Sequence, residues 1–168
     1  MAVPFSGPDS MNIKVAIVTV SDSRSLVEDS SGDKLEQLLR DRGACMIERV
    51  VVTDDLDGLK NELGRLISDD AELIVTTGGT GLGPRDNTPE ATLAVIDREV
   101  PGIAEAMRRE TYGKTPMSML SRGVAGVSGR TLIINLPGSP KAVEECFEVL
   151  RPVLAHAVNL LRGHTRHD

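Results

Sequence analysis

The sequence predicts an α/β fold in which a mainly parallel sheet is covered by helices on both faces. Short apolar runs alternate with amphipathic helical segments along the first two thirds of the chain, and this order favours right-handed strand–helix–strand units. The run at 14–20 is apolar on both faces and the run at 72–77 is apolar at its centre, as expected for strands inside a parallel sheet. Residues 46–52 supply a further strand.

Helical spacing of apolar residues predicts three helices between and after these strands. The first begins near Ser30, whose hydroxyl is available to cap it, and stops at Gly43. The second carries the apolar positions of 59–67. The third begins at Thr88, which we expect to be its N-cap, and turns Leu93 inward.

The C-terminal third predicts a strand pair followed by a broken helix. Residues 124–127 and 131–136 flank a short polar connection, which is typical of a hairpin and could add an antiparallel edge to the sheet. An apolar stripe with helical spacing then runs through 143–161, and Pro152 inside it should kink or split the helix.

The composition fits one domain with small-molecule partners. The chain has 168 residues, so we expect one domain over 12–163 after a disordered tail at 1–11. A net charge of −6 and 2% aromatic residues argue against nucleic acid and membranes as partners. The sequence shows no membrane span and no signal-peptide pattern, so we expect a cytoplasmic protein. Cys45 and Cys146 are expected to be free thiols.

Four segments of unusual composition follow predicted strands. They are residues 19–22, 52–55, 76–90 and 135–141. Ligands of doubly wound sheets bind outside the carboxyl ends of the strands, so we expect these segments to share one binding site.

The glycine-rich segment at 76–90 predicts a phosphate site. A strand that leads through Gly78, Gly79, Gly81 and Gly83 into a helix N-terminus lets backbone amides approach an anion closely. The segment matches neither the P-loop nor the GxGxxG pattern. Arg85 could pair with phosphate or form a surface ion pair.

Acidic residues beside these glycines have two interpretations. Asp86 could hold a divalent metal that bridges phosphates, or it could favour the positive end of the following helix. Asp54 and Asp55 pose the same choice between ligand and helix cap. The segment 135–141 is either a second anion-receptive helix terminus or a plain strand-to-helix turn.

Three motifs together resemble the molybdopterin-binding family. They are TGGTGLGPRDNTPEAT at 77–92, SRGVAG at 121–126 and NLPGSPKA at 135–142, and the likeness runs from about 14 to 150. The resemblance implies a three-layer αβα sandwich, usually trimeric. It also implies a reaction in which the terminal phosphate of molybdopterin attacks the α-phosphate of Mg-ATP, giving adenylylated molybdopterin and pyrophosphate.

The resemblance also assigns roles to residues of this chain. Two aspartates would be catalytic, Asp54 and Asp86, and Asp86 would also bind Mg²⁺. Phosphates of ATP would be held by Gly78, Gly79, Thr80, Gly81 and Glu90. The pterin side would be formed by Ser21, Ser121, Pro137, Gly138 and Ser139. The sequence departs from the family at Asn87, where an aliphatic residue is common.

Other functions are compatible with the same resemblance. A non-catalytic molybdopterin-binding carrier or regulator is the main alternative, and hand-over of the product to a molybdate-inserting enzyme is an implied partnership. A molybdate-inserting enzyme would need extra domains. A pterin dehydratase would need histidines in the pocket, whereas His156, His164 and His167 trail toward the C-terminus and are expected at the surface.

Overall fold

The computed structural model describes residues 11–23 and 25–164. One sheet contains the strands β1 Lys14–Val20, β2 Cys45–Val52, β3 Leu73–Thr77, β4 Arg98–Glu99, β5 Ala125–Ser128 and β6 Thr131–Leu136. The α-helices are α1 Ser30–Arg40, α2 Leu56–Ser68, α3 Thr88–Val95, α4 Pro101–Tyr112, α5 Pro140–Leu150 and α6 Leu154–Leu161. Two short 3₁₀ helices are η1 Leu26–Glu28 and η2 Pro116–Leu120.

The sheet is mostly parallel with an antiparallel edge. Its strand order is β2-β1-β3-β6-β5-β4. The strands β2, β1, β3 and β6 are parallel to one another, whereas β5 runs antiparallel to β6 and to β4. The predicted fold class is therefore confirmed, and the strand pair near 124–136 forms its antiparallel part.

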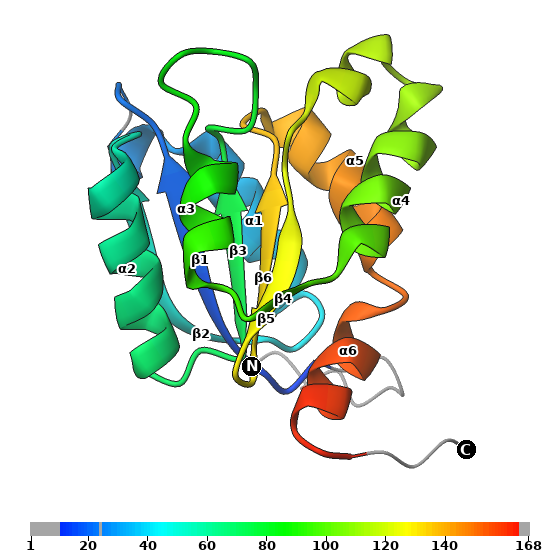
Figure 1. The fold of residues 1–168 in the computed structure, drawn as a ribbon. Helices are drawn as coiled ribbons and strands as arrows, with labels where there is room; N and C mark the ends of the chain where they lie inside the picture. The colour runs from blue at the N-terminus through cyan, green and yellow to red at the C-terminus, as the bar shows by residue number, and fades with distance from the viewer. Residues whose placement is uncertain (1–10, 24, 165–168) are drawn as a thin grey trace.

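Helices cover both faces of the sheet and enclose two cores (Figure 1). On one face α2 and α3 pack over the inner side chains of the strands, and the core is lined by Leu59, Leu63, Leu66, Ile74 and Ile133. On the other face α1, α4, α5 and α6 bury a larger core, which includes Leu35, Leu39, Met107, Phe147 and Val158. Aliphatic side chains thus build a three-layer sandwich.

Helix boundaries follow local chemistry, with two differences from prediction. The N-cap of α1 is Asp29, whose carboxylate accepts from Gly32, rather than Ser30. Helix α3 follows Asn87, and the Thr88 hydroxyl donates to the carbonyl of Gly78 at 2.9 Å instead of capping the helix. The split at Pro152 is confirmed, because α5 ends at 150 and α6 begins at 154.

Three further differences from prediction concern the exposure of Leu93, the short strand β4 and the position of Met11. Leu93 was expected to face inward but is 46% exposed, because the buried face of α3 is formed by Thr88, Pro89, Ala91 and Thr92. The two-residue strand β4 has no sequence signal of its own. Most of the predicted tail, 1–10, lies outside the described residues, but Met11 is buried and its amide donates to Arg42 at 2.7 Å.

No helix among the described residues is long and apolar enough to cross a membrane. His156 and His164 are exposed as expected, and His167 lies outside the described residues. Cys45 is an exposed free thiol and Cys146 a buried one.

Candidate functional site

The carboxyl ends of the four parallel strands meet along one rim of the sheet. Strand β1 is followed by Ser21 and Asp22, β2 by Asp54, and β6 by the turn 137–139. After β3 the chain forms a long loop at 78–87, the glycine loop, which rises beyond the end of the sheet (Figure 1). Because β1 lies between β2 and β3, this rim holds the topological switch point at which doubly wound sheets bind ligands.

Gly78 begins the glycine loop in a conformation that only glycine fits. Its φ is 94°, in the left-handed region that L side chains rarely adopt. Its N–H donates to the carbonyl of Leu136 at 3.1 Å, and a Cβ here would overlap the carbonyl oxygen of Val20. The ends of β1 and β6 therefore close around the first residue of the loop.

The turn 137–139 is fixed by contacts from two helices. Ser139 caps α5 by accepting from the Ala142 amide at 3.2 Å, which is the capping role expected of a serine. The Ser31 hydroxyl, at the start of α1, donates to the Gly138 carbonyl at 2.6 Å. A Cβ on Gly138 would lie 3.3 Å from the Cα of Gly78. The turn and the glycine loop therefore touch through their backbones.

Four consecutive amides in the glycine loop are available to a ligand. Among the described residues, the N–H groups of 79–82 donate no hydrogen bond to the protein, whereas the next amide, Gly83, donates to Asp86 Oδ2 at 2.9 Å. Successive unpaired amides form a concave donor surface that suits an anion. The loop therefore offers main-chain donors where the sequence predicted phosphate binding.

Asp54 is a buried carboxylate at the rim, with 8% of its surface exposed. Its Oδ1 accepts from the Asn87 amide at 2.9 Å, and its own amide donates to Asp22 at 3.0 Å. Burial raises the pKa of the Asp54 carboxyl; the Asn87 hydrogen bond opposes this rise, and the charges of Asp86 and Asp22 add to it. Asp54 is thus a carboxylate whose charge lacks full compensation.

Asp22 and Arg85 form an ion pair above Asp54. The guanidinium donates to both oxygens of Asp22, at 2.7 and 3.1 Å, and this pairing holds the pKa of Asp22 below its usual value. Arg85 was expected either to pair with phosphate or to form a surface ion pair, and in the structure it forms the surface ion pair. Asp86 is turned back into its own loop, because its Oδ2 accepts from Gly83.

The acidic residues offer oxygen ligands to a divalent cation. Within 11–23 and 25–164, no group of three or more His, Cys, Asp or Glu side chains is arranged to hold a metal. In the same part of the chain, Asp54 Oδ2 accepts no hydrogen bond. Because Mg²⁺ is commonly held by one or two carboxylates together with substrate phosphates, these residues fit a cation shared with a phosphate ligand.

Arg122 ties the glycine loop to the segment that follows η2. Its backbone amide donates to the Thr80 carbonyl at 2.8 Å, and its guanidinium donates to the carbonyls of Gly81 and Asp86, each at 2.8 Å. The guanidinium also pairs with Glu90, which lowers the pKa of that carboxyl. The carboxylate that was predicted to contact nucleotide is therefore engaged within the protein.

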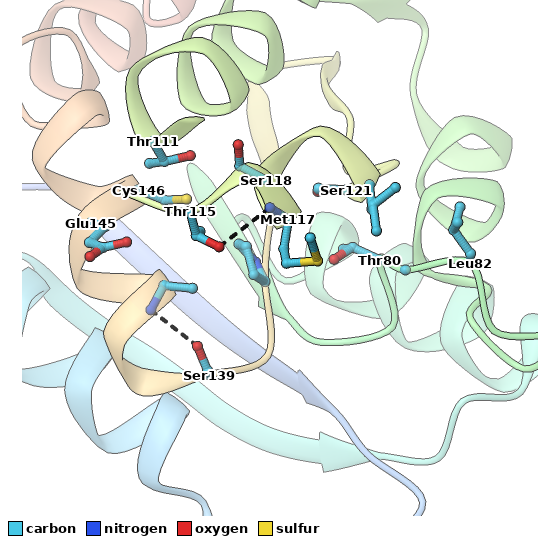
Figure 2. Close-up of a pocket in the computed structure, with 14 residues that line it drawn as sticks. Thr80, Leu82, Thr111, Thr115, Met117, Ser118, Ser121, Ser139, Glu145 and Cys146 are labelled. Atoms are coloured by element: carbon cyan, nitrogen blue, oxygen red, sulfur yellow. Dashed lines mark hydrogen bonds between the residues drawn. The ribbon is translucent and has the colours of Figure 1, made fainter. Parts of the chain in front are cut away.

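A cavity of 510 Å³ opens beside the glycine loop. Figure 2 shows Thr80 and Leu82 toward one end, Glu145 and Cys146 toward the other, and Met117 between them. The remaining lining includes Thr111 of α4, Ser118 and Leu120 of η2, and Ala142 of α5. A concave, largely apolar pocket with a few polar groups is typical of a small-molecule site.

The cavity brings together some of the predicted site residues. Those that line it are Thr80, Gly81, Ser121, Pro137 and Ser139. The others lie along the same rim but outside the lining: Ser21, Asp54, Gly78, Gly79, Asp86, Glu90 and Gly138. The predicted pterin and phosphate residues thus meet at Thr80 and Gly81. Of the two aspartates predicted to be catalytic, Asp86 lies within the glycine loop and Asp54 follows β2, and neither lines the cavity.

The sequence did not predict that residues of η2, α4 and α5 form walls of the cavity. Cys146 is 5% exposed, and burial raises the pKa of its thiol to about 11. Met117 is 63% exposed at the cavity. An apolar TPMSML segment before SRG at 115–120 was the available signal.

The fold and the rim define an α/β ligand-binding protein, and comparison with known proteins gives its family. Residues 16–156 match the family described as "Probable molybdopterin binding domain". The chain therefore belongs to the molybdopterin-binding family of molybdenum cofactor biosynthesis.

Individual relatives agree with this family. The Helicobacter pylori protein named molybdopterin adenylyltransferase is 36% identical over 157 residues, which cover 90% of this chain and 89% of that protein. The Drosophila melanogaster molybdenum cofactor synthesis protein cinnamon is 40% identical over 154 residues, but these cover 89% of this chain and only 26% of the longer protein. The crystal structure of the Thermus molybdopterin biosynthesis enzyme MoaB has a TM-score of 0.82 at 47% identity, covering 90% of this chain and 97% of that one.

Proposed function

We propose that this chain adenylylates molybdopterin with Mg-ATP. The observation that carries the proposal is the row of four amides at 79–82 that donate to no described residue. Residues 80–82 of this row line the cavity, and Gly79 and Gly81 lie beside the carboxylates of Asp54 and Asp86. A pterin in the cavity would present its terminal phosphate at Thr80 and Gly81. The relative named molybdopterin adenylyltransferase supports the same reaction.

The reaction needs position and charge neutralisation more than a nucleophilic side chain. A terminal phosphate oxygen of molybdopterin forms a bond to the α-phosphorus of ATP. The bond from that phosphorus to the oxygen bridging the β-phosphate breaks, and pyrophosphate leaves with the electron pair. Phosphoryl chemistry of this kind depends chiefly on alignment of the two phosphates.

Residues of the chain divide these tasks. The amides of 79–82 would hold phosphate oxygens, and the N-terminal end of α3 would add its positive dipole. Asp54 and Asp86 would bind Mg²⁺ together with the nucleotide phosphates, and the ion would neutralise charge that the two carboxylates would otherwise repel. The cavity wall would orient the pterin and exclude water.

Variants of the two aspartates test the proposal. Asp86→Asn and Asp54→Asn should each reduce pyrophosphate release from molybdopterin and Mg-ATP by more than 100-fold, while molybdopterin affinity measured by calorimetry changes less than threefold. Asp57→Asn, on the exposed face of α2, is the matched control and should keep wild-type turnover. Unchanged turnover in Asp86→Asn would remove that carboxylate from the mechanism.

A molybdopterin carrier without transferase activity is the second candidate, because the description of the matching family names binding of molybdopterin and no reaction. A carrier would bind molybdopterin with the affinity of an enzyme but release no pyrophosphate with ATP. We also propose a homotrimer that passes its product to a molybdate-inserting enzyme. Light scattering of the purified chain measures the first part of that proposal, and transfer of labelled product measures the second.

A further inference from the structure

The glycine loop depends on a residue outside it. Residues 78–87 include four glycines at 78, 79, 81 and 83, and glycine loses more backbone freedom on ordering than any other residue. Within the loop, the described hydrogen bonds include Gly83 to Asp86 Oδ2 at 2.9 Å and the Asp86 amide to the Gly83 carbonyl at 3.0 Å. Such short-range bonds close the tip of the loop but do not hold it against the body of the protein.

Arg122 supplies contacts between the loop and the body. Its amide and guanidinium together bind the carbonyls of Thr80, Gly81 and Asp86, so they reach both sides of the loop tip. The guanidinium also pairs with Glu90 in the first turn of α3. Two of its side-chain bonds go to neutral carbonyls in a partly buried setting, which distinguishes Arg122 from an ordinary surface ion pair.

These carbonyl contacts also set the direction of amides. In a planar trans peptide the C=O and the N–H point in opposite directions. The Asp86 carbonyl accepts from Arg122 at 2.8 Å, and the N–H of the same peptide unit, on Asn87, donates to Asp54 Oδ1 at 2.9 Å. A single peptide plane therefore joins the Arg122 guanidinium to the Asp54 carboxylate.

The same geometry applies at the unpaired amides. The carbonyls of Thr80 and Gly81 point to Arg122, so the N–H groups of Gly81 and Leu82 point away from it. Those two amides belong to the row 79–82 that has no acceptor among the described residues. Arg122 thus fixes the donor face of the loop without using its own charge on the ligand.

We infer that Arg122 is a positioning residue, which orders the glycine loop so that its amides are preset to bind phosphate and the Asn87 amide is preset to hold Asp54. The ordering of the loop is independent of the reaction, whereas its effect on ATP affinity rests on the proposed function. The guanidinium acts through the backbone, so lysine should replace it only in part, because an ammonium cannot span three acceptors as a planar guanidinium does.

Hydrogen exchange of the full chain without ligand tests the ordering. In Arg122→Gln, the hydrogen-bonded amides at the end of the loop should exchange at least tenfold faster than in wild type, and Arg122→Lys should fall between the two. These amides belong to Gly83, Asp86, Asn87 and Thr88. Arg109→Gln removes an exposed ion pair to Glu110 and should leave their exchange unchanged. Glu90→Gln keeps the carbonyl contacts and should change exchange less than threefold.

Calorimetry with Mg-ATP tests the consequence for ligand binding. Arg122→Gln should lose at least tenfold in ATP affinity, with partial recovery in Arg122→Lys. Wild-type exchange rates in Arg122→Gln would overturn the inference, as would fast exchange in Glu90→Gln equal to that of Arg122→Gln, since the ion pair alone would then order the loop. If wild type binds no ATP but the exchange results hold, the proposed function fails and the ordering role of Arg122 stands.

Discussion

Gly78 and Gly138 bring two loops together backbone to backbone: a Cβ on Gly138 would lie 3.3 Å from the Cα of Gly78. One residue begins the glycine loop and the other lies in the turn before α5. A side chain at Gly138 would press on the start of the glycine loop, whereas one at Gly78 would overlap the Val20 carbonyl at the end of β1. The closeness of these segments is therefore encoded by glycine.

Alanine substitutions at Gly78 and Gly138 should lower the free energy of unfolding by different amounts, because only Gly78 has a strained backbone conformation. Gly78→Ala combines a φ of 94° with overlap of the Val20 carbonyl, so we expect a loss of about 3 kcal/mol or more in the free energy of unfolding. Gly138→Ala meets only the tight 3.3 Å contact and should lose about 1 kcal/mol. Urea denaturation measures both.

Gly64→Ala is the control for these two variants. Gly64 lies within α2, where an added Cβ meets nothing within 4 Å, so the variant should be stabilised by about 0.4–1 kcal/mol. Equal stability of Gly78→Ala and Gly64→Ala would contradict the packing described for the rim.

Asp54→Asn should be more stable than wild type at neutral pH. Burial raises the pKa of Asp54 above its ordinary value of 3.8, so the folded state binds more protons than the unfolded state between those two values. The contribution of Asp54 to stability therefore falls as pH rises from 3.8 through the raised pKa. The advantage of asparagine should be full above this window and vanish below pH 3.8.

Thermal unfolding between pH 3.5 and 8 measures this difference. Asp57→Asn is the control, and it should lower stability at neutral pH rather than raise it. The reason is that the helix dipole favours an acidic residue in the first turn of α2. A stability difference between Asp54→Asn and wild type that does not change with pH would show that Asp54 is not desolvated in the folded protein.

Asn135→Ala should be strongly destabilising. The side chain is 1% exposed; its amide donates to the hydroxyls of Thr76 and Thr92 at 3.0 and 2.9 Å and accepts from the Val124 amide at 3.1 Å. Removing it leaves these buried groups without a partner, which costs about 2–4 kcal/mol. Asn61→Ala on the exposed face of α2 should change stability by less than about 0.5 kcal/mol. A small effect at both sites would refute the buried network.

Alkylation should distinguish the two thiols and report occupancy of the cavity. Cys45 is exposed, whereas burial raises the pKa of Cys146 to about 11, so its thiolate is scarce at pH 8. With iodoacetamide we expect one fast and one slow thiol by mass spectrometry. Molybdopterin should slow Cys146 further and leave Cys45 unaffected, because only Cys146 lines the 510 Å³ cavity. Protection of Cys45 instead would place the ligand elsewhere.

Features set by local sequence were predictable. The strand at 14–20, the break at Pro152 and the strand-to-helix path through the glycines each depend on neighbouring residues. The fold class followed from their order. The shared rim also followed, because parallel strands end at the same edge of a sheet.

Features that depend on contacts between distant segments were not predictable. Arg122 looked uninformative beside Ser121, since its acceptors lie about 40 residues earlier in the chain. The orientation of Asp86 was left between a metal and the helix dipole, whereas its Oδ2 bonds to Gly83 within the loop. The cavity walls include residues of η2, α4 and α5. No local sequence pattern predicts that these elements face the glycine loop.

A single-turnover measurement tests the central claim most directly. The purified chain is mixed with molybdopterin, ATP and Mg²⁺, and adenylylated molybdopterin is quantified by mass spectrometry beside the pyrophosphate released. Our account predicts the two products in equal amounts and neither product when molybdopterin or Mg²⁺ is left out. Binding of both substrates without formation of either product would contradict it.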